Sequence, residues 1–282
     1  MKPTVIHKKP TRSFHVFASL WSLRQYPTHA REWSWDRKFR AIQDGGFEGV
    51  FSPPLPILAE RGALAYLAVT SLGTDSNVAK ALQLPKDLGA VAIDVQLCDY
   101  DTPLSDALTV ALEIRQAARE IGIGFAIETH RDTFTETPEA TLALFNAYRD
   151  ATGEDMPCCL DHSHFAVVRH IAPPYWPRLK VPVELLRAAT QYHLRPFNGH
   201  HCQIPALSLA GRRTAEYRSW LEYATELLLD ANKQPSSEAI RVVPEIGHAA
   251  PAYRLSGFPD TWRDVLTVSA DLRRIQKGAE NA

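Results

Sequence analysis

Four short apolar runs in this chain each end in an acidic residue or a histidine. The closing residues are Glu128, Asp161, His193 and Glu245, which lie 33, 32 and 52 positions apart (128 to 161, 161 to 193, 193 to 245). A spacing of about 30 residues is what one strand and its following helix occupy in a parallel α/β protein. In a barrel of such units, the carboxyl ends of the strands meet at one mouth. The spacing therefore predicts that these four side chains converge on a single site.

Strand-like and helix-like segments alternate along the whole chain. We expect eight strands, at residues 14–20, 47–51, 64–71, 89–97, 123–129, 156–161, 190–196 and 240–245. We expect helices at residues 35–44, 56–62, 76–82, 102–121, 137–153, 211–232 and 259–277. Thr102-Pro103 and Thr137-Pro138 are helix start signals, and Gly122 is a stop signal. Eight strands alternating with helices in 282 residues indicate an α/β protein with a (β/α)8 TIM barrel, as one domain spanning residues 1–282.

The composition excludes several functional classes. Hydrophobic residues make up 45% and charged residues 22% of the chain, and the net charge of −1 indicates no basic surface for nucleic acid. No apolar run reaches the roughly 18–20 residues of a membrane span. The apolar run at 14–23 is interpreted as the first strand and not as a signal peptide, because His15 and Ser19 interrupt it. Four cysteines in a chain of this length indicate reduced thiols and a cytoplasmic setting.

Histidines gather in the half of the chain that carries these strand ends. Seven of the eleven, at positions 130, 162, 164, 193, 200, 201 and 248, lie at or just after the fifth to eighth expected strands. Taken singly, each is typical of a surface or loop histidine. Three carboxylates and one imidazole at four strand ends instead form an oxygen-rich set suited to one divalent ion, Mn²⁺, Mg²⁺, Co²⁺ or Zn²⁺. Such an ion polarises a chelated carbonyl, so that a nearby carboxylate or histidine can remove the adjacent proton.

The four segments resemble the xylose isomerase-like TIM barrel superfamily, which includes sugar phosphate isomerases and epimerases, ketose 3-epimerases, hydroxypyruvate isomerase, inosose dehydratase and endonuclease IV. The resemblance lies in Glu128, the Asp161-x-x-His164 pair, the His193-Leu-Arg segment and Glu245. It implies that Glu128, Asp161, His193 and Glu245 hold the metal ion, and that His164 contacts substrate oxygens. It also implies catalytic roles for both glutamates, as acid and base on opposite faces of the substrate, alongside His164.

One segment departs from the superfamily pattern. Soon after His193 the chain reads Asn198-Gly199-His200-His201, in place of the usual short ending of this motif. The histidine pair is either a further ligand or substrate contact, or part of a turn at Asn198-Gly199. His193 is the preferred ligand, because it lies inside the apolar run, where a strand side chain points into the mouth.

The first half of the chain separates this protein from the nuclease branch of the superfamily. Endonuclease IV holds three metal ions and uses extra histidines after its earlier strands. The corresponding segments here, residues 50–53, 69–72 and 93–96, contain no histidine. The chain also has no basic stripe for DNA. One metal ion and no nucleic-acid partner are therefore expected.

Further side chains flank the expected site and are candidate substrate contacts. They are Trp21, His130, His164, Arg195, His200 and His201. For Trp21, packing is the favoured explanation. Arg195 either orients a carboxylate ligand, binds an anionic group of the substrate or is a solvated charge at the rim.

Together these features predict a metal-dependent isomerase or epimerase acting on a small sugar or a related polyhydroxy carbonyl compound. A dehydratase or lyase acting on a keto-inositol or keto-sugar starts from the same enolate, and the sequence leaves it open. A non-catalytic sugar-binding barrel is the alternative of another class. The paired glutamates argue against it, since binding alone needs no acid and base. The identity of the substrate, its phosphorylation and homo-oligomer formation are also left open.

Overall fold

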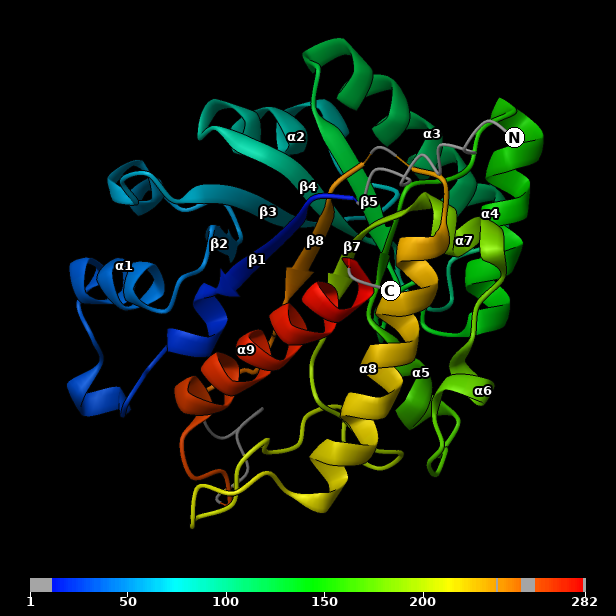
Figure 1. Cartoon of the computed structure of the whole chain (residues 1–282). Coiled ribbons are helices and arrows are strands. Elements are labelled where there is room, and N and C mark those ends of the chain that lie inside the picture. The colour runs from blue at the N-terminus through cyan, green and yellow to red at the C-terminus, as the bar shows by residue number, and fades with distance from the viewer. Residues whose placement is uncertain (1–11, 237, 250–256, 281–282) are drawn as a thin grey trace, which may run out of the picture.

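Eight parallel strands form a closed barrel in the order of the sequence (Figure 1). The computed structural model describes residues 12–236, 238–249 and 257–280. The strands are β1 (Phe14–Ser19), β2 (Gly49–Ser52), β3 (Ala65–Leu72), β4 (Ala90–Leu97), β5 (Gly124–Glu128), β6 (Cys158–Leu160), β7 (Ala189–His193) and β8 (Ile240–Val243). Strand β1 pairs with both β2 and β8, which closes the sheet. The predicted (β/α)8 TIM barrel is thereby confirmed.

Helices surround the barrel (Figure 1). They are α1 (Trp35–Asp44), α2 (Val78–Asp87), α3 (Leu104–Ile121), α4 (Pro138–Thr152), α5 (His162–Val168), α6 (Trp176–Leu179), α7 (Val183–Ala188), α8 (Ala215–Lys233) and α9 (Thr261–Glu280), with 3-10 turns η1 (Leu20–Leu23), η2 (His29–Arg31) and η3 (Pro56–Glu60). The predicted cap at Thr137 is present, because its side chain accepts from the Ala140 N–H at 3.2 Å. Gly122 ends α3 in a left-handed conformation with φ 64°. Within the described residues, no helix has the length and apolar character needed to cross a bilayer.

Several predicted helices differ in their bounds, and α8 begins at Ala215 and not at 211, because Thr214 is its N-cap. The segment at 56–62 forms only the 3-10 turn η3. Helix α2 continues past its predicted end at residue 82 to Asp87, because Leu82 and Pro85 are both buried and packing overrides the poor helix propensity of proline. Helix α3 starts after Pro103 and not at Thr102, whose hydroxyl instead accepts from the Asp99 N–H at 3.2 Å.

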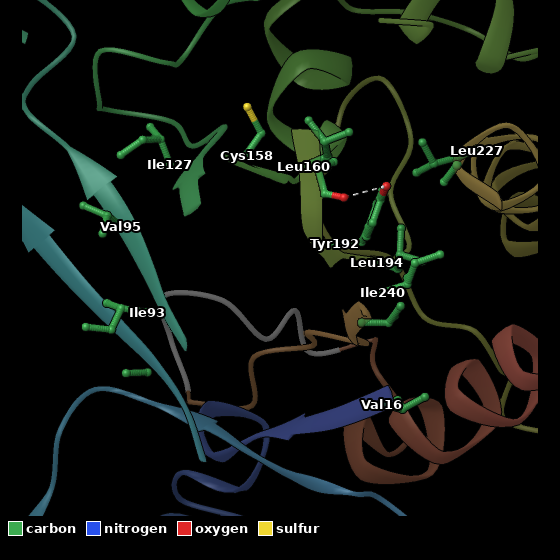
Figure 2. Packing of buried hydrophobic residues seen from close by; sticks show 14 of the residues in the cluster. Val16, Ile93, Val95, Ile127, Cys158, Leu160, Tyr192, Leu194, Leu227 and Ile240 are labelled. Carbon is green, nitrogen blue, oxygen red and sulfur yellow. Dashed lines mark hydrogen bonds between the residues drawn. The ribbon is translucent and has the colours of Figure 1, made fainter. Parts of the chain in front are cut away.

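Alternating side chains of the strands build two apolar layers. The barrel interior is filled by Phe17, Phe51, Leu67, Ala92 and Val243. The outer layer packs between strands and helices, and Figure 2 shows part of it, with Val16, Ile93, Ile127, Leu160, Tyr192 and Ile240 of the barrel and Leu227 of α8. Burying each large side chain of this kind contributes about 1.5–3 kcal/mol. The interior layer also supports the site, since the Phe51 ring lies 4.7 Å from that of His193 in an edge contact.

The buried carboxyl of Asp264 on α9 makes the stability of the fold depend on pH. Its Oδ1 accepts from the Leu207 N–H at 2.9 Å, and its Oδ2 has no hydrogen-bond partner among the described residues. Burial raises the pKa of Asp264 from 3.8 to about 7. The folded state therefore binds more protons than the unfolded chain between these values, so the contribution to stability is full below pH 3.8 and declines as pH rises towards 7.

We expect Asp264→Asn to reduce the loss of thermal stability between pH 5 and pH 8. One pKa unit corresponds to about 1.4 kcal/mol, and only the two units from pH 5 to the raised pKa of about 7 lie in this window, so the upper limit for the difference is about 3 kcal/mol. Differential scanning calorimetry at both pH values measures it. Asp44→Asn on the exposed end of α1 is the matched control and should leave the pH dependence as in the parent protein. An Asp264→Asn protein with the parent's pH dependence would contradict the assignment.

Candidate metal centre

Glu128, Asp161, His193 and Glu245 come together at the carboxyl end of the barrel. Glu128 and His193 are the last residues of β5 and β7, Asp161 follows β6 directly, and Glu245 lies two residues after β8. Each offers one ligand atom, and these four atoms all lie within 4.8 Å of one another. The convergence predicted from the spacing is present. The role of the four as metal ligands stays a prediction.

The contacts within this cluster are electrostatic. His193 Nδ1 lies 2.7 Å from Glu128 Oε1 and 3.7 Å from Glu245 Oε2. Burial alone would lower the pKa of His193, but the neighbouring carboxylates of Glu128 and Asp94 raise it to about 10. Burial likewise opposes ionisation of Glu128, but the charge of His193 holds the pKa of its carboxyl below the ordinary value. The imidazolium therefore compensates buried negative charge at this place.

The donor set fits a divalent cation. Glu128 Oε2 is buried and has no hydrogen-bond partner among the described residues, so it has an unused lone pair in the cluster. Carboxylate oxygens with one imidazole nitrogen are the ligands expected for Mn²⁺, Mg²⁺, Co²⁺ or Zn²⁺. The side chain of Glu245 is 13% exposed whereas those of Glu128 and His193 are 1% exposed, so the centre is open on the side of Glu245.

Asp161 is held more firmly than a simple strand end would be. It is the N-cap of α5, and its Oδ1 accepts from the Ser163 N–H at 2.9 Å. The Thr129 side chain binds both backbone groups of Asp161, since its hydroxyl accepts from the Asp161 N–H at 2.8 Å and donates to the Asp161 carbonyl at 3.1 Å. The Asp161-x-x-His164 motif is therefore the start of a helix, which brings His164 back beside Asp161 one turn later.

Arg195 forms a buried ion pair with Asp161. Its Nη2 donates to Asp161 Oδ2 at 2.6 Å and lies 3.0 Å from His164 Nε2. Burial would raise the pKa of Asp161, but the guanidinium lowers it to about 2. Arg195 is only 4% exposed, which corrects the interpretation of a solvated rim charge. Of the alternatives from the sequence, orientation of a carboxylate is the one that these contacts support.

A cavity of about 710 Å³ opens beside the cluster. Three of its wall residues, Glu128, His193 and Glu245, belong to the candidate centre. The predicted substrate contacts Trp21, His130 and Arg195 also line it. Lys38, Glu32, Arg24, Arg131 and Gln96 complete much of its polar wall. Trp21 both lines the cavity and packs, since a Cβ added to Gly247 would lie 2.5 Å from its ring.

Three predicted substrate contacts lie outside this wall. His164 is buried and adjoins Arg195, so its reach to the substrate stays a prediction. His200 and His201 line neither the cavity nor the ligand cluster. The Asn198 Oδ1 accepts from both of their N–H groups, at 2.9 and 2.8 Å, which makes them part of the turn that was the alternative.

The reason for the turn is steric as well as polar. A Cβ on Gly199 would lie 2.1 Å from the Ile171 carbonyl oxygen, so only glycine allows this approach. The ring of His200 packs against His170 at 5.5 Å. The contacts of the pair are therefore local, and a role for either histidine in substrate binding stays a prediction.

Two residues near the cluster were missed by the sequence analysis. Asp94 on β4 and Cys159 on β6 form, with Glu128 and His193, a second group whose ligand atoms all lie within 4.8 Å of one another. The signal was the carboxylate itself, since an acidic residue inside the apolar run 90–95 has to be buried. Lys38, buried on α1 and ion-paired to Glu32, gave no such signal.

Comparisons with known proteins bear on the fold. The sequence matches no family model and no curated protein. Among solved structures it is similar to a D-allulose 3-epimerase from Methylomonas sp. (12% identity, 97% of this chain and 100% of the other, TM-score 0.57). It is also similar to a xylose isomerase-like TIM barrel protein from Mycobacterium smegmatis in complex with magnesium (12% identity, 95% of this chain and 98% of the other, TM-score 0.57). A third similar structure is the 3-keto-D-glucoside 4-epimerase from E. coli (14% identity, 93% of this chain and 100% of the other, TM-score 0.55). These likenesses agree with the (β/α)8 TIM barrel fold expected from the sequence, and the superfamily resemblance of the four segments stays a prediction.

Proposed function

We propose that this protein is a metal-dependent isomerase or epimerase acting on a sugar or a related polyhydroxy carbonyl compound. The observation that carries the proposal is the pair Glu128 and Glu245. These carboxylates come from β5 and from the segment after β8, and they line the same cavity. Their ligand atoms lie within 4.8 Å of those of Asp161 and His193. A site for binding alone needs no such pair, whereas moving a proton off and back onto carbon needs a base and an acid.

The residues of the chain have separate tasks in this proposal. Glu128, Asp161, His193 and Glu245 would hold the ion. A bound divalent ion would supply Lewis-acid polarisation of a carbonyl, which acidifies the neighbouring C–H bond. Glu245 and Glu128 would remove and return the proton, because both carboxylates reach the cavity. Arg195 would orient the Asp161 carboxylate, since its Nη2 donates to Asp161 Oδ2 at 2.6 Å.

The solved structures support the substrate class. D-Allulose 3-epimerase and 3-keto-D-glucoside 4-epimerase are, by name, enzymes that invert a sugar carbon, and each aligns with more than nine-tenths of this chain. The fold of this chain holds its carboxylates at the mouth of the same kind of barrel. We extend their reaction class, and not their individual substrates, to this protein.

Deuterium uptake from solvent tests the proposal. The protein loaded with Mn²⁺ is incubated in D₂O with D-allulose, D-tagatose and a 3-keto-D-glucoside, and products are followed by mass spectrometry and NMR. We expect an isomer or epimer with one carbon-bound deuterium, and no reaction after the ion is removed by chelation. Loss of water from the product would assign the dehydratase alternative. Saturable binding of a sugar without turnover would assign the binding-protein alternative, and either result would refute the proposal.

A further inference from the structure

Asp94 is an acidic residue placed inside the barrel without an evident partner. It lies in β4, pairs in register with Ala126 of β5, and is 0% exposed. Neither of its carboxylate oxygens has a hydrogen-bond partner of good geometry among the described residues. Its polar neighbours are Glu128, Cys159 and His193. Burying a carboxyl group without partners is costly, so the residue calls for a physical explanation.

The geometry of His193 suggests that explanation. The two ring nitrogens face different groups: Nδ1 faces Glu128 and Glu245, at 2.7 and 3.7 Å, and Nε2 faces Asp94 Oδ2 at 3.9 Å. The edge contact with Phe51 restrains the ring in this orientation. One nitrogen therefore points at the candidate metal centre and the other at Asp94.

We propose that Asp94 is a positioning residue that accepts a hydrogen bond from the Nε2–H of His193 and so keeps Nδ1 free to bind the metal ion. This inference rests on the proposed function. Metal-binding histidines almost always donate their second N–H to a carboxylate, a carbonyl or water, which sets the tautomer and the ring angle. The observed distance between His193 Nε2 and Asp94 Oδ2 is 3.9 Å, which exceeds the usual N–H···O length by about 1 Å. A small shift of the carboxylate would therefore make the bond.

The test compares two substitutions of similar size, of which only one keeps a hydrogen-bond acceptor. Asp94→Asn keeps an acceptor oxygen for the Nε2–H, whereas Asp94→Leu has a similar size and no acceptor. Mn²⁺ affinity and stoichiometry are measured by calorimetric titration of the full chain. We expect Asp94→Leu to bind Mn²⁺ about 10–100-fold more weakly, and Asp94→Asn to retain most of the affinity. Asp101→Asn, on the exposed loop after β4, is the control and should bind as the parent does.

Two further measurements separate positioning from a structural role. Melting of the metal-free variants checks that each one is folded, so that a change in Mn²⁺ affinity is not caused by unfolding. In ¹H–¹⁵N spectra of the Zn²⁺-loaded protein, the Nε2–H proton of His193 should be shifted downfield and exchange slowly with water in the parent and in Asp94→Asn, because it is hydrogen-bonded. A folded Asp94→Leu with unchanged affinity would overturn the inference. If Asp94→Leu does not fold, a parent protein whose His193 Nε2–H proton is neither shifted downfield nor slow to exchange would overturn the inference.

The outcomes also distinguish this inference from the proposed function. A parent protein that binds one divalent ion, together with an Asp94→Leu variant that binds it equally well, removes only the role of Asp94. A parent that binds no divalent ion overturns both. A parent that binds two ions and an Asp94→Asn variant that binds one would make Asp94 a ligand with Glu128 and Cys159, which replaces the positioning role.

Discussion

The double variant Glu128→Gln/Glu245→Gln is expected to lose its divalent ion and at least about a thousandfold in turnover. Each glutamine keeps the size of the side chain but removes a charge, so the ligand set would fall from three carboxylates to one. The loss of general acid–base catalysis alone is worth about 10²–10⁴-fold. Metal content after dialysis is measured by inductively coupled plasma mass spectrometry, and turnover by the deuterium assay described above.

The matched control for this variant carries two glutamate substitutions elsewhere. Glu113→Gln/Glu120→Gln changes two exposed glutamates on α3 and should keep both the ion and the activity. A Glu128→Gln/Glu245→Gln protein that retains a stoichiometric ion after dialysis would exclude these residues as the metal ligands. Retained ion with lost turnover would assign them to proton transfer alone.

Arg195→Met is expected to destabilise the metal-free protein by about 3–5 kcal/mol, because it leaves the buried carboxylate of Asp161 without its counter-charge. The Nη2–Oδ2 distance is 2.6 Å, and the two side chains are 4% and 0% exposed. A bound divalent ion supplies positive charge to the same carboxylates, so the loss should be smaller with Mn²⁺ present. For a domain of this size the metal-free midpoint should fall by roughly 10 °C.

Thermal melts in chelator and in Mn²⁺ measure the loss of stability without the ion and with it. Arg40→Met removes an exposed pair with Asp36 and is the control, expected to change stability by less than about 1 kcal/mol. Arg195→Lys keeps the charge but loses the planar donor geometry, and should lie between the two. An Arg195→Met protein with the same loss in chelator and in Mn²⁺ would contradict the link between this ion pair and the metal centre.

Parts of the candidate site were predictable from local patterns. Glu128 and His193 lie at the mouth as expected, because an apolar run of strand length closed by a polar residue marks where a buried strand reaches the mouth, although the strands end at these residues and not at 129 and 196. Asp161 was placed correctly along the chain, but its role as the N-cap of α5 went unrecognised. The cap signal was visible in the sequence, since aspartate is a preferred N-cap residue and Asp161 lies two residues before Ser163, from whose N–H it accepts a hydrogen bond.

Other parts could not be predicted from one strand at a time. Asp94 lies mid-strand, and its neighbourhood with His193 depends on how β4 is staggered against β5, β6 and β7. The His200–His201 pair follows a strand end as closely as many ligands do. Whether such residues point into the mouth or fold away was decided by the Asn198 hydrogen bonds and by the space beside Ile171.

By itself the sequence determined the barrel, the direction of its strands and the mouth at which Glu128, Asp161, His193 and Glu245 meet. Hydrophobic periodicity is a local property, and parallel strands joined by helices have one carboxyl end in common. Only the tertiary structure decided that Arg195 is buried against Asp161, that Asp94 lies at the far nitrogen of His193, and that His200 and His201 form a turn. These contacts join residues from different strands and loops. Their distances follow from barrel stagger and loop packing, which no single segment of the chain encodes.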